Sequence, residues 1–185
     1  MIGYALCGSF CTFSASLNVL SSLVKTYDVQ PIMSQVAATT DTRFGAAATL
    51  RTKIEDLCGR AIIDTIPDAE PLGPARPLDG LVICPCTGNT LAKMANGITD
   101  TPVCMAAKAH LRSDRPLIIA LASNDAMSAN LKNMATLLNR KQVYFVPMRQ
   151  DDPVSKPHSL VADFHLVEEA LAAALSGKQL RPLFL

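Results

Sequence analysis

Short runs of apolar residues alternate along the chain with longer segments in which apolar residues recur every three or four positions. The short runs are typical of strands and the longer segments of helices. The predicted strands cover 2–7, 28–33, 61–66, 81–84, 117–122 and 143–147, and the run at 61–66 is the weakest. The predicted helices cover 12–25, 46–58, 88–96, 102–112, 126–140 and 159–175. Glycines 59, 97 and 177 are placed to end three of these helices, and Ser159 is placed to cap the last.

The predicted strands are continuously apolar rather than alternating, as in LIIALA at 117–122. Strands of this kind are buried on both faces, and their alternation with helices indicates a parallel sheet between helix layers. We therefore expect an α/β fold with one domain over residues 1–185. It should be a doubly wound, open parallel sheet of about six strands with helices on both faces. Prolines at 67, 71, 74 and 77 predict one long loop within it.

Small hydroxyl and amide residues follow the predicted strands at the points where helices begin. They are Ser9 and Thr12, then Ser34 to Thr42, then Thr87, Asn89 and Thr90, and finally Ser123, Asn124 and Asp125. Taken singly, each loop is explained by helix capping. The carboxyl ends of parallel strands share one edge of a sheet, however, so four such loops together form an uncharged cradle rich in donors. Such a cradle suits a phosphate or a flavin.

Composition narrows the classes of function. Apolar residues make up 49% of the chain and charged residues 18%, which excludes a disordered protein. The net charge is +1 and Trp is absent, so no nucleic-acid partner is expected. No apolar run approaches the roughly 20 residues that cross a bilayer, and no basic region precedes the first apolar run. We therefore expect no membrane partner and a cytoplasmic location.

The six cysteines do not have the spacing of a zinc site, and the three histidines lie far from them in the sequence. No metal and no disulfide framework are expected, and small buried thiols are the ordinary interpretation. Cys86 leaves two interpretations open. A nearby helix start could lower the pKa of its thiol, or the side chain could serve only in packing.

Two common nucleotide motifs are missing. The sequence contains no G-x-x-x-x-G-K-[ST] loop, and Gly8 lacks the further glycines of the dinucleotide fingerprint. An NAD(P) site is therefore not expected within this chain. A phosphate monoester at the start of the first helix is expected instead, bound by backbone N–H groups and the hydroxyls of Ser9 and Thr12.

The segment PCTGNTLAKMANGITD at 85–100 resembles the P-A-S-A-N-T motif region of the flavoprotein superfamily that includes cysteine decarboxylases and flavin prenyltransferases. GSFCT at 8–12 resembles the first phosphate loop of those proteins. Within the superfamily, TRFG at 42–45, KIEDL at 53–57, EPLGP at 70–74, MAAKA at 105–109, ND at 124–125 and QDDP at 150–153 resemble a family of sporulation proteins. The resemblance extends over nearly the whole chain.

The resemblance implies an FMN site and a trimer-based homo-oligomer, because the flavin of the decarboxylases lies between subunits of a trimer. The implied phosphate contacts are Gly8, Ser9 and Thr12. Thr42 and Ser123 would complete the ribityl-phosphate pocket, and Thr87, Asn89 and Thr90 would lie along the isoalloxazine ring.

The sporulation family further implies the dehydrogenation of a small dicarboxylate, dihydrodipicolinate, in the cytoplasm of the mother cell. This reaction needs a hydride acceptor, a base and cations for two carboxylates. NAD(P) would be bound by a partner polypeptide, the A subunit of a two-subunit enzyme, which has its own dinucleotide-binding domain.

Four cations are candidates for binding a substrate carboxylate: Arg43, Lys53, Lys93 and Lys108. Arg43 is favoured because it lies at the predicted rim and its guanidinium can bind both carboxylate oxygens. Asn124 could bind a carboxylate or only cap its helix. The chain departs from the decarboxylases, since PLGPARPLDG at 71–80 holds no His where they have a catalytic one. Two alternatives stay open: a non-catalytic scaffold for the dinucleotide-binding partner, and a flavin-dependent cysteine decarboxylase.

Overall fold

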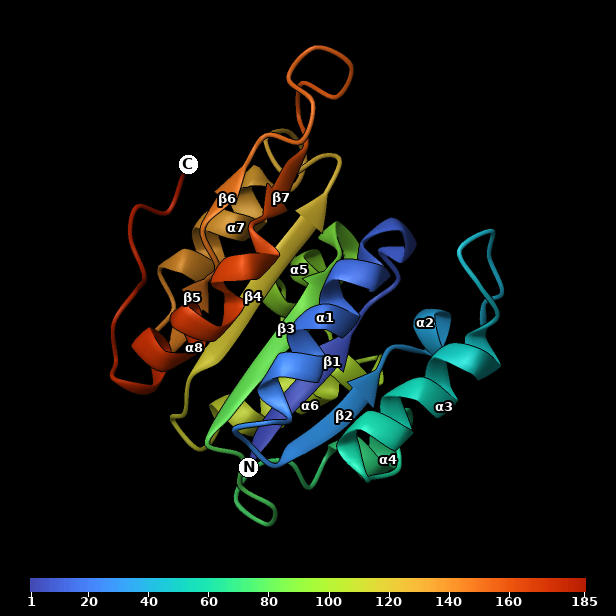
Figure 1. The fold of residues 1–185 in the computed structure, drawn as a ribbon. Helices are drawn as coiled ribbons and strands as arrows, with labels where there is room; N and C mark the ends of the chain where they lie inside the picture. The colour runs from blue at the N-terminus through green and yellow to red at the C-terminus, as the bar shows by residue number, and fades with distance from the viewer.

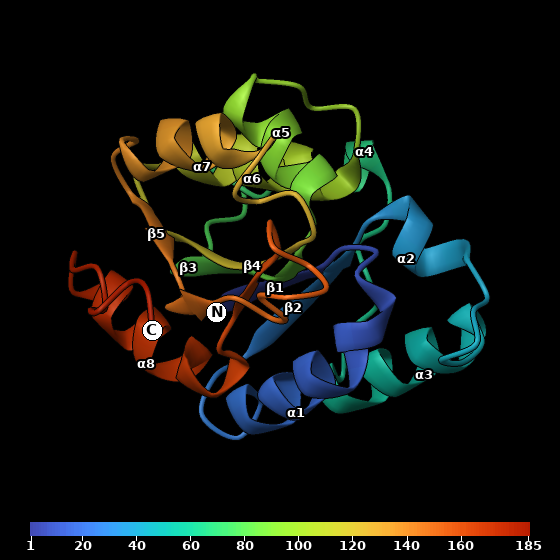
Figure 2. The same cartoon turned by 90° about the horizontal axis from the view of Figure 1, so that it is seen from above.

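The computed structural model describes residues 1–185 and contains one seven-stranded sheet with helices on both faces (Figures 1 and 2). The strands are β1 (Ile2–Leu6), β2 (Val29–Met33), β3 (Gly80–Cys86), β4 (Leu117–Ser123), β5 (Val143–Phe145), β6 (Met148–Arg149) and β7 (Leu160–Ala162). The helices are α1 (Phe13–Leu23), α2 (Gln35–Thr39), α3 (Ala47–Cys58), α4 (Ile66–Ala69), α5 (Gly88–Ala95), α6 (Pro102–Leu111), α7 (Leu131–Leu138) and α8 (Val167–Leu175). Two 3-10 turns, Phe10–Thr12 and Phe164–Leu166, precede α1 and α8.

The strand order reverses between β1 and β3, because the chain first extends the sheet from β1 to β2 and then crosses to β3 on the other side of β1. The order is β2-β1-β3-β4-β7-β6, and β5 pairs with the first half of β4. Strands β2, β1, β3, β4 and β5 are parallel, whereas β7 is antiparallel to both β4 and β6. In open sheets of this type, ligands bind at the carboxyl ends of the strands beside the reversal point. A ligand-binding site is therefore expected at the loops after β1, β3 and β4.

Each face of the sheet is covered by its own helices. Seen from above, α5, α6 and α7 lie on one side of the sheet, and α1, α3 and α8 lie on the other (Figure 2). Alternate residues of each strand point into the two resulting cores. Ile83 and Ile119 belong to the core under α5 and α6, and Val82 and Ile118 belong to the core under α1 and α8. Burial on both faces explains the unbroken apolar runs in the sequence.

The expected α/β class and the strands at β1, β2, β3, β4 and β5 are confirmed. The predicted strand at 61–66 is wrong, because only Ile63 forms an isolated bridge, to Ile32. Thr65 caps α4 by accepting a hydrogen bond from the Asp68 amide, and Pro67 favours a helix start. A short helix therefore replaces the end of this strand and the beginning of the predicted proline-rich loop.

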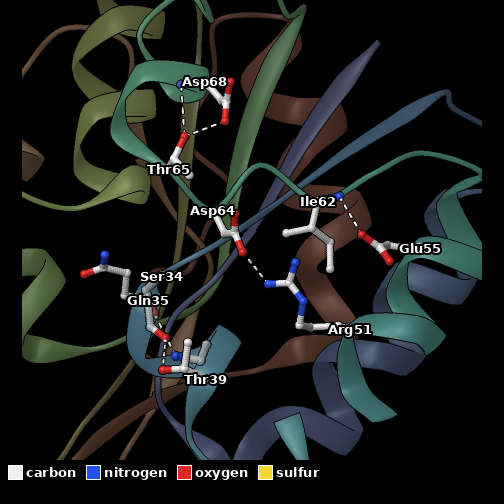
Figure 3. Close-up of polar contacts among 10 residues, drawn as sticks. Ser34, Gln35, Thr39, Arg51, Glu55, Ile62, Asp64, Thr65 and Asp68 are labelled. Carbon is white, nitrogen blue, oxygen red and sulfur yellow. Dashed lines mark hydrogen bonds and ion pairs between the residues drawn. The ribbon is translucent and has the colours of Figure 1, made fainter. Parts of the chain in front are cut away.

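Polar contacts hold the segment between α3 and α4 against α3 (Figure 3). Arg51 of α3 forms an ion pair with Asp64, and Glu55 accepts a hydrogen bond of 3.1 Å from the Ile62 amide. Ser34 caps α2 by accepting from the Ala37 amide at 3.3 Å, so part of the predicted loop after β2 is a helix. The connection over 40–46 then joins α2 to α3, and Asp41 accepts a hydrogen bond of 2.8 Å from the Ala47 amide at the start of α3.

The last predicted helix is wrong in its first half. Residues 160–162 form β7, and α8 begins only at Val167. Strand β5 pairs only with residues 117–119 of β4, which leaves the edge of Ala122 and Ser123 to be paired by β7. An exposed strand edge needs such a partner for its backbone groups. Ser159 consequently precedes a strand and caps no helix. The predicted helix at 126–140 likewise shortens to α7.

Tyr4 of β1 links the sheet to α1 and should contribute measurably to stability. It is fully buried and donates a hydrogen bond of 2.9 Å to the Ser16 carbonyl, while Ser16 Oγ donates to the Cys84 carbonyl at 2.7 Å. Tyr4→Phe should lower the free energy of unfolding by about 1–2 kcal/mol in urea denaturation. Tyr144→Phe is the matched control, since its half-buried hydroxyl makes only a 3.4 Å contact. Equal stabilities of the two variants would contradict this role of Tyr4.

None of the helices has the combination of length and apolar character needed to cross a membrane.

Candidate functional site

The loops at the carboxyl ends of β1, β3 and β4 enclose one cavity of about 850 Å³, here named the rim cavity. Eight of the ten site residues expected from the sequence line it: Gly8, Ser9, Thr12, Arg43, Thr87, Asn89, Ser123 and Asn124. Its volume lies in the range of small-molecule and cofactor sites. The loops after β1, β3 and β4 thus converge beside the reversal point of the sheet, whereas the loop after β2 contributes only Arg43 and Phe44. The expectation of an uncharged cradle is wrong, because Arg43, Asp125, Asp151 and Lys156 also line the cavity.

The loop after β1 presents backbone donors to the rim cavity. The amides of Gly8, Phe10 and Cys11 have no hydrogen-bond acceptor within the chain. The Thr12 hydroxyl donates to the Ser9 carbonyl at 2.8 Å, which closes the 3-10 turn and leaves the hydroxyl oxygen free to accept. Unpaired amides that converge at the start of a helix are the usual way in which proteins bind phosphate.

The loop after β3 begins α5. Thr87 Oγ1 accepts a hydrogen bond from the Thr90 amide at 3.3 Å, which is the capping arrangement that the sequence suggested. Thr90 itself does not line the rim cavity. Its side chain is buried and donates to Cys7 Sγ at 3.3 Å. The Asn89 side chain, by contrast, is one of the cavity-lining groups.

Cys86 precedes this loop and is fully buried. Burial raises the pKa of the Cys86 thiol well above its ordinary value, and the nearby thiols of Cys7 and Cys104 add to this effect. The idea that a helix start lowers this pKa is therefore wrong, and the packing interpretation fits the structure. A neutral buried thiol is a poor nucleophile.

The loop after β4 carries a fixed carboxylate. Asp125 Oδ1 accepts hydrogen bonds from Ser123 Oγ at 2.6 Å and from Asn130 Nδ2 at 2.9 Å, and Oδ2 accepts from the same Asn130 amide at 2.9 Å. These hydrogen bonds, first that of Ser123, hold the pKa of Asp125 below its ordinary value. The sequence placed Asp125 at the rim but gave it no role, and no local pattern pointed to Asn130.

The connection between α2 and α3 contributes Arg43 and Phe44 to the lining of the cavity. Residues 42–45 form a turn in which Thr42 and Gly45 exchange two backbone hydrogen bonds of 3.0 Å. The Arg43 guanidinium lies over the Phe44 ring, 4.9 Å from its centroid, and both residues line the rim cavity. Such a stacked arrangement orients the guanidinium, which retains its donors for a ligand.

Thr42 lies beside the rim cavity rather than in it. It lines a neighbouring apolar pocket of about 330 Å³ together with Phe10, Phe13 and Phe44. Phe10 and Phe44 belong to both cavities and form the wall between them. The Thr42 hydroxyl accepts from the Phe44 amide at 3.1 Å, so its main visible role is to shape this turn.

The other candidate cations are placed elsewhere. Lys53 lines the apolar pocket, and Lys93 forms an ion pair of 2.8 Å with Asp100. Lys108 lines a small cavity beside α6. The sequence missed Lys156, which comes from the β6–β7 loop, lines the rim cavity and pairs with Asp151 at 2.5 Å. The rim cavity therefore has two cations, Arg43 and Lys156.

The residues present fit a flavin mononucleotide. The unpaired amides of the first loop match a phosphate, the cavity volume admits a ring system, and the apolar wall of Phe10 and Phe44 can contact an aromatic ring. No histidine lines the cavity.

The sequence profile of the family described as Flavoprotein matches residues 1–174. The chain is 44% identical over 183 residues to the B subunit of dipicolinate synthase from Bacillus subtilis (strain 168), a match that covers 98% of this chain and 92% of the relative.

Two crystal structures share the fold. The B subunit of dipicolinate synthase from Bacillus halodurans C superposes with a TM-score of 0.91 at 40% identity, covering 100% of this chain and 95% of the other. The FMN-dependent cysteine decarboxylase SpaF superposes with a TM-score of 0.68 at 26% identity, covering 95% and 94% of the two chains.

Proposed function

The chain belongs to the Flavoprotein family and is related over its whole length to dipicolinate synthase B subunits, and we propose that it acts as the B subunit of such an enzyme. In this role it takes part in the NAD(P)-linked oxidation of dihydrodipicolinate to dipicolinate. The single observation that supports this most is the end-to-end similarity to the two Bacillus proteins. The proposal is tested by assaying dipicolinate formation by this chain, by the dinucleotide-binding partner and by their mixture.

The rim cavity is the proposed reaction site. The amides of Gly8, Phe10 and Cys11, with the hydroxyls of Ser9 and Thr12, would bind the phosphate of FMN. FMN held here supplies a two-electron acceptor. Ser123 and Asn89 would border the ligand from the β4 and β3 loops, while Thr90 supports the β3 loop from beneath.

The chain's own cations bind and orient the substrate. Arg43 would hold one carboxylate of dihydrodipicolinate through two parallel hydrogen bonds, because its planar guanidinium matches the two carboxylate oxygens. Lys156 is the second cation, and its bond to Asp151 would be exchanged for a bond to the other carboxylate. Asn124, which lines the cavity, would donate to a substrate oxygen.

NAD(P) belongs to the dinucleotide-binding partner in this proposal, because the first loop of this chain is not a dinucleotide fingerprint. Arg43 and Lys156 line the cavity and are both exposed to solvent, so that the partner can approach them. A trimer-based homo-oligomer would supply further cover for a bound ring.

Flavin binding gives a direct check of the cavity. The purified protein, incubated with FMN and then dialysed, should keep the absorbance of a flavin and should bind FMN at least about tenfold more tightly than riboflavin. The difference reflects charge-assisted hydrogen bonds from the first loop to the phosphate. Thr12→Val keeps the side-chain shape and should reduce this preference. Equal affinities for FMN and riboflavin in the unmodified protein would contradict the phosphate assignment.

A further inference from the structure

The two ends of the rim cavity differ in hydrogen-bonding character. At the β1 end, the amides of Gly8, Phe10 and Cys11 are unpaired donors, and all three residues line the cavity. At the β4 end, Asp125 is the charged residue among those of the β4 loop that line the cavity. The unpaired donors therefore favour binding of an anion at the β1 end, whereas the negative charge of Asp125 disfavours it at the β4 end.

The Asp125 carboxylate is held in place by a chain of side-chain amides. Asn130, which donates to both carboxylate oxygens, accepts a hydrogen bond of 2.8 Å from Asn133 Nδ2. Asn133 accepts in turn a hydrogen bond of 3.3 Å from Asn96, which links this series of side-chain amides to the end of α5. Asn130 and Asn133 are both buried. A carboxylate fixed by this many buried donors cannot easily turn away from a ligand.

Gly88 shows how tightly this group packs against α5. A Cβ atom at Gly88 would lie 2.4 Å from Ser123 Oγ, 2.7 Å from Asn130 Nδ2 and 2.9 Å from Asp125 Oδ1. The amides of Gly88 and Asn89, which begin α5, have no acceptor within the chain. The carboxylate thus supplies the negative charge at this helix start, where a ligand phosphate could otherwise bind.

One acceptor position of the carboxylate is left over. A carboxylate offers about four lone-pair positions, and Ser123 and Asn130 occupy three of them. The free position is on Oδ2, and Asp125 lines the cavity. The bonds from Ser123 and Asn130 keep the pKa of Asp125 low, so the group is an anion at neutral pH. A ligand that reaches this end is best matched by an N–H donor.

We propose that Asp125 is a specificity-determining residue that accepts a hydrogen bond from a ring N–H of the ligand and repels anionic groups from the start of α5 beside Gly88. The ligand is thereby oriented, with its phosphate or carboxylate toward the β1 loop and its N–H edge toward Asp125. For the flavin part this inference rests on the proposed function, since the N–H edge is then the N3–H of the isoalloxazine.

The test compares riboflavin with 3-methylriboflavin, in which a methyl group replaces the hydrogen on N3. The unmodified protein should bind riboflavin about tenfold more tightly, the expected effect of one hydrogen bond to a charged acceptor. Asp125→Asn, which has nearly the same size, should reduce this preference to about threefold or less, because a neutral amide oxygen is a weaker acceptor than a carboxylate, and its folding is checked by its thermal unfolding. Asp151→Asn is the matched control, because it removes another cavity carboxylate and should leave the tenfold preference unchanged. Persistence of the full preference in Asp125→Asn would overturn the proposal.

A second measurement needs no flavin. Crystals of the unmodified protein soaked in inorganic phosphate should show phosphate at the 8–12 loop only, whereas Asp125→Asn crystals should also show it beside Gly88. Phosphate beside Gly88 in the unmodified protein, or the same phosphate positions in both proteins, would overturn the exclusion of anions. If the unmodified protein binds no flavin but passes this test, the FMN assignment fails while the role of Asp125 stands.

Discussion

A mixture of this chain with the dinucleotide-binding partner should form dipicolinate from dihydrodipicolinate at least about a hundredfold faster than either polypeptide on its own. Oxidation requires the substrate and the hydride acceptor to be held together, and correct positioning alone accounts for rate factors of this order or more. This chain provides the rim cavity with Arg43 and Lys156, but it has no dinucleotide fingerprint. The dehydrogenation therefore needs groups from both polypeptides.

The measurement is the initial rate of dipicolinate formation at a fixed amount of one polypeptide and increasing amounts of the other. The rate should rise and reach a plateau at a defined ratio of the two chains. Full activity of this chain without its partner would overturn the two-subunit proposal. Full activity of the partner without this chain would remove this chain from the reaction.

The central sheet was predictable because its strands carry their own signal. Strands β1, β3 and β4 are buried on both faces, which accounts for their continuous apolar runs. The position of the rim loops was predictable for a related reason, since parallel strands bring their carboxyl ends to one edge of the sheet. Gly8, Ser9, Thr87 and Ser123 consequently line one cavity.

Features that depend on distant partners were not predictable. Residues 160–162 form a strand because β5 leaves the end of β4 unpaired, a fact that no local pattern contains. The role of Asp125 depends on Asn130, which reaches back across a turn. Lys156 enters the rim cavity only because the β6–β7 loop returns to the sheet. Local periodicity identifies elements, whereas these contacts exist only after the elements have packed.

Arg43→Ala should lower kcat/KM of the two-subunit enzyme for dihydrodipicolinate about a hundredfold. Removal of one partner from a charge pair that is desolvated in the complex costs roughly 3 kcal/mol, which corresponds to this factor. Arg43 lies over Phe44 at the mouth of the rim cavity, so its guanidinium is oriented before a ligand arrives. Arg43→Lys should recover only part of the activity, because an ammonium keeps the charge but loses the paired donors.

The matched control is Arg112→Ala, which removes an exposed guanidinium from the end of α6, away from the rim cavity. Its kcat/KM should remain within about twofold of the unmodified enzyme, since surface charges outside a binding site contribute little.

A scaffold that only stabilises the dinucleotide-binding partner needs its interface but not its cavity. Unchanged turnover in Arg43→Ala, with a complex of normal stability in size-exclusion chromatography, would therefore favour the scaffold. A hundredfold loss in the same intact complex would place substrate binding in this chain, because the cavity-facing guanidinium then matters for turnover and not for assembly.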